Sequence, residues 1–138
     1  RAIPAIRLLL KVGHFKSDSS LAAFLPELNG IVDGVTLVNG ISRPVRHRNG
    51  TPVFGDDYVN AGVLGRAIHE PSVANVRTAA KIIADESLDL AVLAVGGISQ
   101  PADMADFFDA GADAVMLGSS PMYLPHLAAE AKREHPEW

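Results

Sequence analysis

The chain has 138 residues, of which 48% are apolar and 20% are charged, which suits one globular domain with a sizeable core and excludes a disordered chain. A formal net charge of −4, without a basic stripe, argues against nucleic acid as a partner. The absence of cysteine excludes a disulfide framework, a cysteine zinc site and a thiol nucleophile. No apolar stretch reaches the roughly 20 residues that a bilayer span needs, so we expect a cytoplasmic protein without a transmembrane segment.

The first third of the chain predicts strand, helix and strand. Residues 5–12 form a continuous apolar run, typical of a buried strand. Ser19 or Ser20 can cap a helix of about ten residues that follows, and Pro26 predicts a kink or an early end. Residues 34–38 predict a second short strand.

The middle of the chain predicts a long loop and then a helix. Residues 39–70 show little periodicity, and a loop of this length inside a compact domain is usually functional or mobile. Residues 71–84 are amphipathic and predict a helix. The loop holds a basic patch, which we interpret as a solvated surface: Arg43, Arg46, His47 and Arg48.

The last third repeats the alternation twice more. Residues 90–95 and 114–117 predict strands, Ser99 can cap the helix between them, and residues 125–133 predict a final helix. Four strand–helix units with nearly continuous apolar strands favour a parallel sheet that is buried on both faces and covered by helices. This is an α/β fold, either half of an eight-unit TIM (β/α)8 barrel or a small open doubly wound sheet, and periodicity alone does not separate the two.

The unusual residues all follow the predicted strands. Lys11 ends the first strand, Asn39 the second, Gly96-Gly97 the third and Gly118-Ser119 the fourth. Ligands of parallel α/β folds collect at this edge of the sheet. Glycine lets a phosphate approach the backbone closely, and free N–H groups at a helix start favour an anion. Two such junctions in succession predict a phosphate site.

Other polar residues carry weaker signals. Lys11 is costly to bury without a partner, so we interpret it as facing a ligand or a carboxylate. Asn39-Gly40 by itself reads as a plain turn. The acidic residues form no obvious catalytic pair. Four histidines lack metal-ligand spacing, and we interpret them as surface or turn residues: His14, His69, His126 and His135.

Six short motifs in order resemble the C-terminal half of the dihydroorotate dehydrogenases, over about residues 8–128. They are Lys11, Val38-Asn39, Ser42-Arg43-Pro44, Ala61-Gly62-Val63-Leu64-Gly65, Val95-Gly96-Gly97-Ile98 and Leu117-Gly118-Ser119. The resemblance implies one domain over residues 1–138, equivalent to strands 5 to 8 of an FMN-binding TIM barrel. It also implies a flavoprotein oxidoreductase that oxidises dihydroorotate to orotate in pyrimidine biosynthesis, with these small molecules as substrate and product.

The resemblance also implies roles for single residues. Lys11 resembles the lysine beside the reactive edge of the flavin, where a positive charge stabilises the anionic reduced form. Asn39 resembles the asparagine that hydrogen-bonds orotate. The implied cofactor-binding residues are Lys11, Gly62, Gly65, Gly96, Gly97, Gly118 and Ser119. Gly40 and Leu64 depart from the family pattern, which usually has Ser or Thr after the asparagine and in some members a small polar residue in the loop.

By the same resemblance, the general base of the family, a Ser or Cys, would lie upstream of Arg1. We therefore expect half a barrel with most of the phosphate site, no catalytic base and little dehydrogenase activity in isolation. One alternative is a non-catalytic phosphate- or flavin-binding half-barrel, which could form a homodimer to close its open sheet edges. Another is a different phosphate-binding TIM-barrel enzyme.

Overall fold

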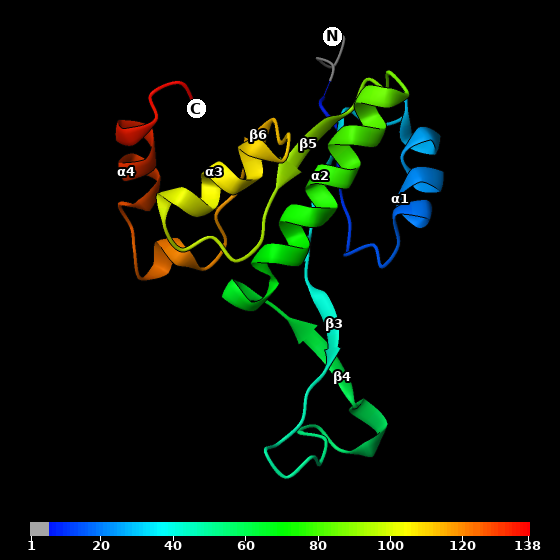
Figure 1. Ribbon diagram of the computed structural model, residues 1–138, viewed down its shortest axis with the longest axis vertical. Helices are drawn as coiled ribbons and strands as arrows, with labels where there is room; N and C mark the ends of the chain where they lie inside the picture. The colour runs from blue at the N-terminus through cyan, green and yellow to red at the C-terminus, as the bar shows by residue number, and fades with distance from the viewer. Residues whose placement is uncertain (1–5) are drawn as a thin grey trace, which may run out of the picture.

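A computed structural model describes residues 6–138, so residue 5 of the first predicted strand lies outside the described part. Its main sheet is parallel throughout, with the strand order β1-β2-β5-β6 (Figure 1). The strands are β1 (Leu9–Lys11), β2 (Gly34–Leu37), β5 (Ala91–Ala94) and β6 (Ala114–Val115). Because every strand runs the same way, the residues that follow the strands meet at one edge of the sheet.

Four α-helices accompany the sheet in residues 6–138: α1 (Asp18–Phe24), α2 (His69–Asp85), α3 (Pro101–Asp109) and α4 (Leu127–Glu134). Helix α2 packs on β2 and β5 and between α1 and α3, and α3 packs on β6 and α4 (Figure 1). The four predicted strand–helix units are thus present in chain order. None of the helices that the structure describes is long and apolar enough to cross a membrane.

The core lies between the sheet and these helices. All four residues of β2 are buried, and Val35 and Leu37 are fully inaccessible, as are Val76 on α2 and Phe107 on α3. The prediction that the strands are buried on both faces was wrong for β1, where Leu9 and Lys11 are exposed. The reason is topological, because among the described strands β1 lies at the edge and pairs with β2 alone.

The helix starts differ from the predicted caps. Helix α1 is capped by Ser17, whose side chain accepts a hydrogen bond from the amide of Ser20, so neither Ser19 nor Ser20 is the cap. The cap of α3 is Gln100, one residue beyond the predicted Ser99. At α1 the Ser17 hydroxyl accepts from a free amide of the first turn, whereas at α3 the Asp103 carboxylate reaches back to the Gln100 amide.

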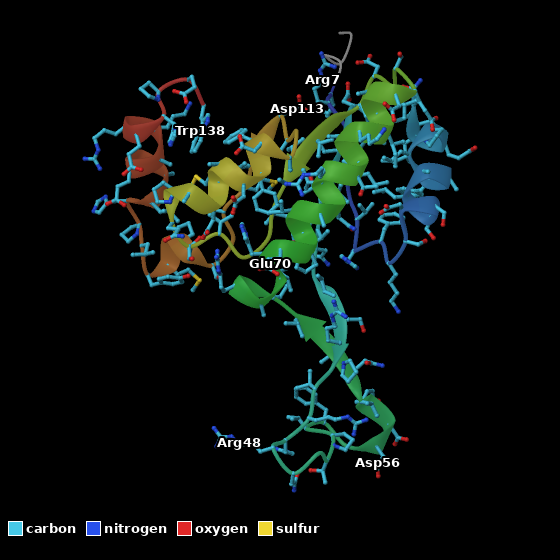
Figure 2. The ribbon with its side chains drawn as sticks, in the orientation of Figure 1. Arg7, Arg48, Asp56, Glu70, Asp113 and Trp138 are labelled. Atoms are coloured by element: carbon cyan, nitrogen blue, oxygen red, sulfur yellow. The ribbon has the colours of Figure 1, made fainter. Side chains whose placement is uncertain are left out.

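The predicted long loop at residues 39–70 contains secondary structure, so that prediction was wrong. Strands β3 (Ile41–Pro44) and β4 (Asn60–Val63) form an antiparallel hairpin that projects from the body of the molecule (Figure 1). Arg48 and Asp56 lie at its far end (Figure 2). The basic patch of this segment is exposed, as expected of a solvated surface.

Candidate functional site

One pocket lies at the edge of the sheet where the parallel strands end. We call it the carboxyl-edge pocket; its volume is about 290 Å³, near the lower end of the ~300–1,000 Å³ typical of small-molecule sites. Seven of the eight predicted site residues line it: Lys11, Asn39, Gly65, Gly96, Gly97, Gly118 and Ser119. The two glycine junctions therefore face one shared space, as the sequence predicted.

The eighth predicted residue, Gly62, is not brought to this pocket. It lies in β4 opposite Ser42 on the hairpin and is exposed. A Cβ added there would meet no atom within 4 Å. Gly62 as a cofactor-binding residue therefore stays a prediction that rests on the resemblance, without support from its position.

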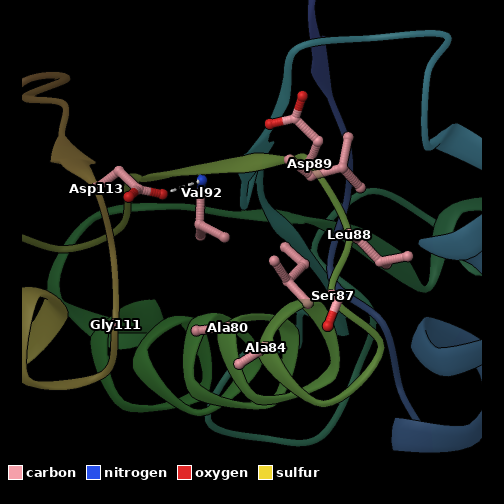
Figure 3. A pocket seen from close by; sticks show the side chains of 10 residues that line it. Ala80, Ala84, Ser87, Leu88, Asp89, Val92, Gly111 and Asp113 are labelled. Carbon is pink, nitrogen blue, oxygen red and sulfur yellow. Dashed lines mark hydrogen bonds between the residues drawn. The ribbon is translucent and has the colours of Figure 1, made fainter.

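A second pocket lies at the opposite edge of the sheet, where β5 and β6 begin (Figure 3). Its volume is about 500 Å³, and Ala80, Ser87, Asp89 and Gly111 help to line it. Asp113 in this pocket accepts a hydrogen bond of 2.7 Å from the Val92 amide, which ties the starts of the two strands together. In barrel folds this edge serves stability and the opposite edge serves chemistry, so the carboxyl-edge pocket is the candidate site.

The glycines of the carboxyl-edge pocket differ in whether the fold requires them. Gly96 and Gly97 have φ values of +153° and +67°, and a Cβ at Gly97 would stand 2.7 Å from the carbonyl oxygen of Gly65. Gly118 has no positive φ, and a Cβ there would meet nothing within 4 Å. The fold itself therefore demands glycine at 96 and 97, whereas at 118 the fold would accept a side chain.

Lys11 and Asn39 stand at the ends of neighbouring strands. Both residues are exposed at the pocket. The backbone amide of Asn39 donates to the Val12 carbonyl at 2.9 Å, which extends the pairing of β1 and β2 by one step. Both side chains are thus anchored by sheet backbone, and an ammonium and a carboxamide are presented at adjacent positions.

The pocket is electropositive in a chain of net negative charge. Its charged lining residues are Lys11 and Arg66, and none of the described lining residues is acidic. Just beyond β1, burial lowers the pKa of His14, and the positive charges of Arg43 and Lys16 lower it further. This distribution favours an anionic ligand.

Comparison with known proteins agrees with this geometry. No family model matches the chain. The chain is 29% identical over 125 residues to a dihydroorotate dehydrogenase of Dictyostelium discoideum, covering 89% of this chain and 34% of that protein. It is 26% identical over 138 residues to the catalytic subunit of dihydroorotate dehydrogenase B (NAD(+)) of Malacoplasma penetrans, covering 91% and 43%. This chain is related to the dihydroorotate dehydrogenases.

The fold of the chain is also similar to that of a solved structure. A crystal structure of the dihydroorotate dehydrogenase of Eimeria tenella, in complex with ferulenol, superposes with a TM-score of 0.70 at 24% identity. The match covers 93% of this chain and 33% of that one. The chain therefore spans between a third and a half of the length of the relatives it matches. The predicted resemblance and the predicted TIM-barrel fragment are both confirmed.

The structure also shows two buried polar residues beside the pocket that the sequence prediction missed, His69 and Asp103. His69 is 4% exposed, so its interpretation as a surface or turn residue was wrong. Its Nδ1 lies 3.1 Å from the Gly96 carbonyl oxygen and its Nε2 lies 2.8 Å from Asp106 Oδ2. The ring also packs edge-on against Phe107, with centroids 5.2 Å apart. His69 therefore fixes the strand–glycine junction from the side of α2.

Asp103 is the second residue that was missed, because the acidic residues showed no pairing in the sequence. It is 1% exposed at the start of α3 and accepts from the Ser99 amide, the Ser99 hydroxyl and the Gln100 amide. Burial by itself would raise the pKa of Asp103, but the hydrogen bonds from Ser99 and the ion pair with Arg66 outweigh it and hold the pKa below its ordinary value. The spacing Gln100-x-x-Asp103 of a capping box was the signal that could have found it.

His69, Asp103 and Asp106 lie close enough to share a metal ion. Protein groups already occupy their ligand atoms, however. Both nitrogens of His69 have partners, and both oxygens of Asp103 accept from protein donors. The cluster therefore acts as a brace beneath the pocket, joining α2 and α3 to the Gly96-Gly97 turn.

Proposed function

We propose that this chain supplies the FMN-binding half of a dihydroorotate dehydrogenase-like oxidoreductase, which oxidises dihydroorotate to orotate. The observation that carries the proposal is the carboxyl-edge pocket, where two strand–glycine junctions, Lys11 and Asn39 meet. The related proteins carry the name of this activity. The oxidation of dihydroorotate, the binding of FMN and a role in pyrimidine biosynthesis are proposed for this chain, because the chain spans less than half of each relative.

The donor set of the pocket fits the phosphate of FMN. Gly97, Gly118 and Ser119 line one space, where their backbone amides and the Ser119 hydroxyl would donate to the phosphate. The open space where a Cβ of Gly118 would stand lets an anion approach the backbone. Arg66 and Lys11 supply positive charge without a competing acid among the described lining residues.

Lys11 and Asn39 fit the flavin ring and the substrate. An ammonium beside the flavin ring stabilises negative charge that develops there. Asn39 offers two donors and one acceptor, a set that matches the carbonyl and ring N–H groups of orotate. Bound FMN would supply the two-electron oxidation. The parts of this chain that do the work would thus be a cation for the ring, an amide for the substrate and a cradle for the phosphate.

A non-catalytic flavin- or phosphate-binding module is the second candidate. One observation favours it: the lining residues already suffice to bind an anion without any reaction, namely Gly97, Gly118, Ser119, Arg66 and Lys11. A different phosphate-binding TIM-barrel enzyme needs the same phosphate cradle but gives no reason for Lys11 and Asn39 to stand at the pocket together.

Flavin titration of the purified protein separates these candidates. The proposal expects FMN to bind with quenching of its fluorescence, and Lys11→Ala to weaken the binding of FMN and riboflavin alike. Orotate should then bind to the FMN complex and perturb the flavin absorbance, and Asn39→Ala should abolish that perturbation while FMN still binds. FMN binding without any response to orotate would favour the non-catalytic module. A protein that binds a sugar phosphate and no flavin would contradict both flavin assignments.

A further inference from the structure

Arg66 is the cation of the pocket that the sequence motifs did not single out. It follows Gly65 in the short 3₁₀ helix Gly65–Ile68 that leads into α2, and it lines the carboxyl-edge pocket. Its Nη1 lies 2.5 Å from Asp103 Oδ1. The Arg66 side chain is 58% exposed whereas the Asp103 side chain is 2% exposed. The guanidinium of Arg66 is therefore held at Nη1 by a buried carboxylate, while more than half of the side chain stays exposed.

The Asp103 carboxylate is itself fixed by hydrogen bonds, and its fixed orientation determines where it holds Arg66. Its Oδ2 accepts from the Ser99 amide at 2.8 Å, the Ser99 hydroxyl at 2.9 Å and the Gln100 amide at 3.2 Å. Its Oδ1 accepts from Gln100 Nε2 and pairs with Arg66. A carboxylate with this many donors has one orientation, so it orients Arg66 before any ligand arrives.

The ion pair leaves Arg66 with capacity for a second acceptor. A guanidinium has five N–H donors in a fixed plane, and it pairs well with phosphate oxygens. Asp103 is its single ion-pair partner among the described residues. The residues that line the pocket together with Arg66 include Gly97, Gly118 and Ser119, the residues assigned to the phosphate cradle.

We propose that Arg66, positioned by Asp103, is a side-chain ligand of a phosphate monoester in the carboxyl-edge pocket. The inference rests on the proposed function and deepens it, because it divides the work between the two cations. Arg66 binds the phosphate, whereas Lys11, at the end of β1, stabilises the flavin ring system. The division makes the phosphate group, and hence the choice of FMN over riboflavin, depend on one side chain.

Paired titrations with FMN and riboflavin test this division, because the two flavins differ only in the phosphate. Arg66→Ala should weaken FMN binding about 10- to 100-fold, the range of one charge-assisted hydrogen bond, and leave riboflavin binding within about twofold of wild type. The FMN affinity of Arg66→Lys should lie between those of wild type and Arg66→Ala, because lysine keeps the charge and loses the planar guanidinium. Arg77→Ala is the matched control, since it removes an exposed arginine of α2 that does not line the pocket.

The outcomes that test the role of Arg66 can be distinguished from those that test the proposed function. Equal loss of FMN and riboflavin affinity in Arg66→Ala, or no loss of either, overturns the role of Arg66 while flavin binding stands. A wild-type protein that binds neither flavin contradicts the proposed function. Inorganic phosphate, followed by phosphorus NMR, then tests Arg66 alone. Phosphate binding that is weakened in Arg66→Ala supports the role, and equal behaviour of the two proteins, including no binding by either, overturns it.

Discussion

The two glycine junctions of the pocket look alike in sequence and differ in physical cause. Gly97 has a φ of +67°, and its missing Cβ makes room for the carbonyl of Gly65 and the backbone of His69. Gly118 has an ordinary backbone and open space where a Cβ would point. Position 97 requires glycine because protein atoms pack against it. Position 118 does not require glycine for folding, so the open space beside it is available to a ligand. A strand–glycine–helix motif thus indicates a site, but the motif alone does not distinguish a glycine required by packing within the protein from a glycine that gives a ligand access.

The largest effect should come from Gly97→Ala. The substitution forces a side chain into a left-handed conformation and into contact with backbone atoms at 2.7 and 3.0 Å, so we expect a loss of about 2–4 kcal/mol in the free energy of unfolding. Urea denaturation followed by circular dichroism measures it. An unchanged unfolding midpoint would mean that the junction is less tightly packed than the structure has it. The variant cannot report on phosphate binding alone, because it damages the fold first.

Asp103→Asn should have the next largest effect. The buried carboxylate loses its charge while Arg66 and Ser99 remain as donors, and we expect a loss of about 2 kcal/mol at pH 7. The pKa of Asp103 is lowered in the fold, so its carboxylate stabilises the fold above the ordinary aspartate pKa of about 4 and loses this contribution as pH falls through the lower folded value. The difference between wild type and variant should therefore be constant from about pH 5 to 7 and narrow below about pH 4. A difference that grows as the solution is acidified would contradict the stabilising role of the charged carboxylate.

Gly118→Ala should leave stability nearly unchanged, within about 0.5 kcal/mol, and weaken FMN binding. Its new methyl group meets no protein atom within 4 Å and occupies the space through which a phosphate reaches the backbone amides. We expect a loss of about tenfold in FMN affinity by fluorescence titration, with the unfolding midpoint as the control. Wild-type FMN affinity in this variant would remove Gly118 from the phosphate cradle.

The smallest effect is expected of Gly62→Ala. This glycine lies in β4, exposed and outside the pocket, and replacing glycine in a strand stabilises by up to roughly 0.5–1 kcal/mol. FMN affinity should stay at the wild-type value. A clear loss of affinity would mean that the family resemblance placed this residue better than the geometry does, with the hairpin approaching the ligand in the bound state.

The order of elements and the edge of the sheet that carries the site could be predicted from sequence. Continuous apolar runs at residues 34–38 and 90–95 fall on β2 and β5, and the residues after them meet because the strands are parallel. The prediction succeeds because burial on both faces leaves a clear hydrophobic signal in the middle of a sheet. The signal fades at the edge strand β1, where Leu9 and Lys11 face solvent.

The hairpin and the brace beneath the pocket could not be predicted in the same way. Strand β3 (Ile41–Pro44) has an exposed run of three residues, so its sequence carries no alternation that a period-two search would detect. His69 is buried by partners from distant parts of the chain, which are set by tertiary packing. Asp103 has a local capping-box signal, but its ion pair with Arg66 depends on tertiary packing. Polar residues at a helix start are therefore worth weighing as buried braces whenever the helix begins beside a predicted site.

The flavin assignment depends above all on the amides of Gly97 and Gly118 binding the same phosphate. An NMR titration of nitrogen-15-labelled protein with FMN tests this residue by residue. We predict that the amide signals of Gly97, Gly118 and Ser119 shift together and saturate at one FMN concentration, while those of Ser87 and Asp89 in the opposite pocket stay in place. Shifts confined to the opposite pocket, or a shift of Gly118 without Gly97, would contradict it.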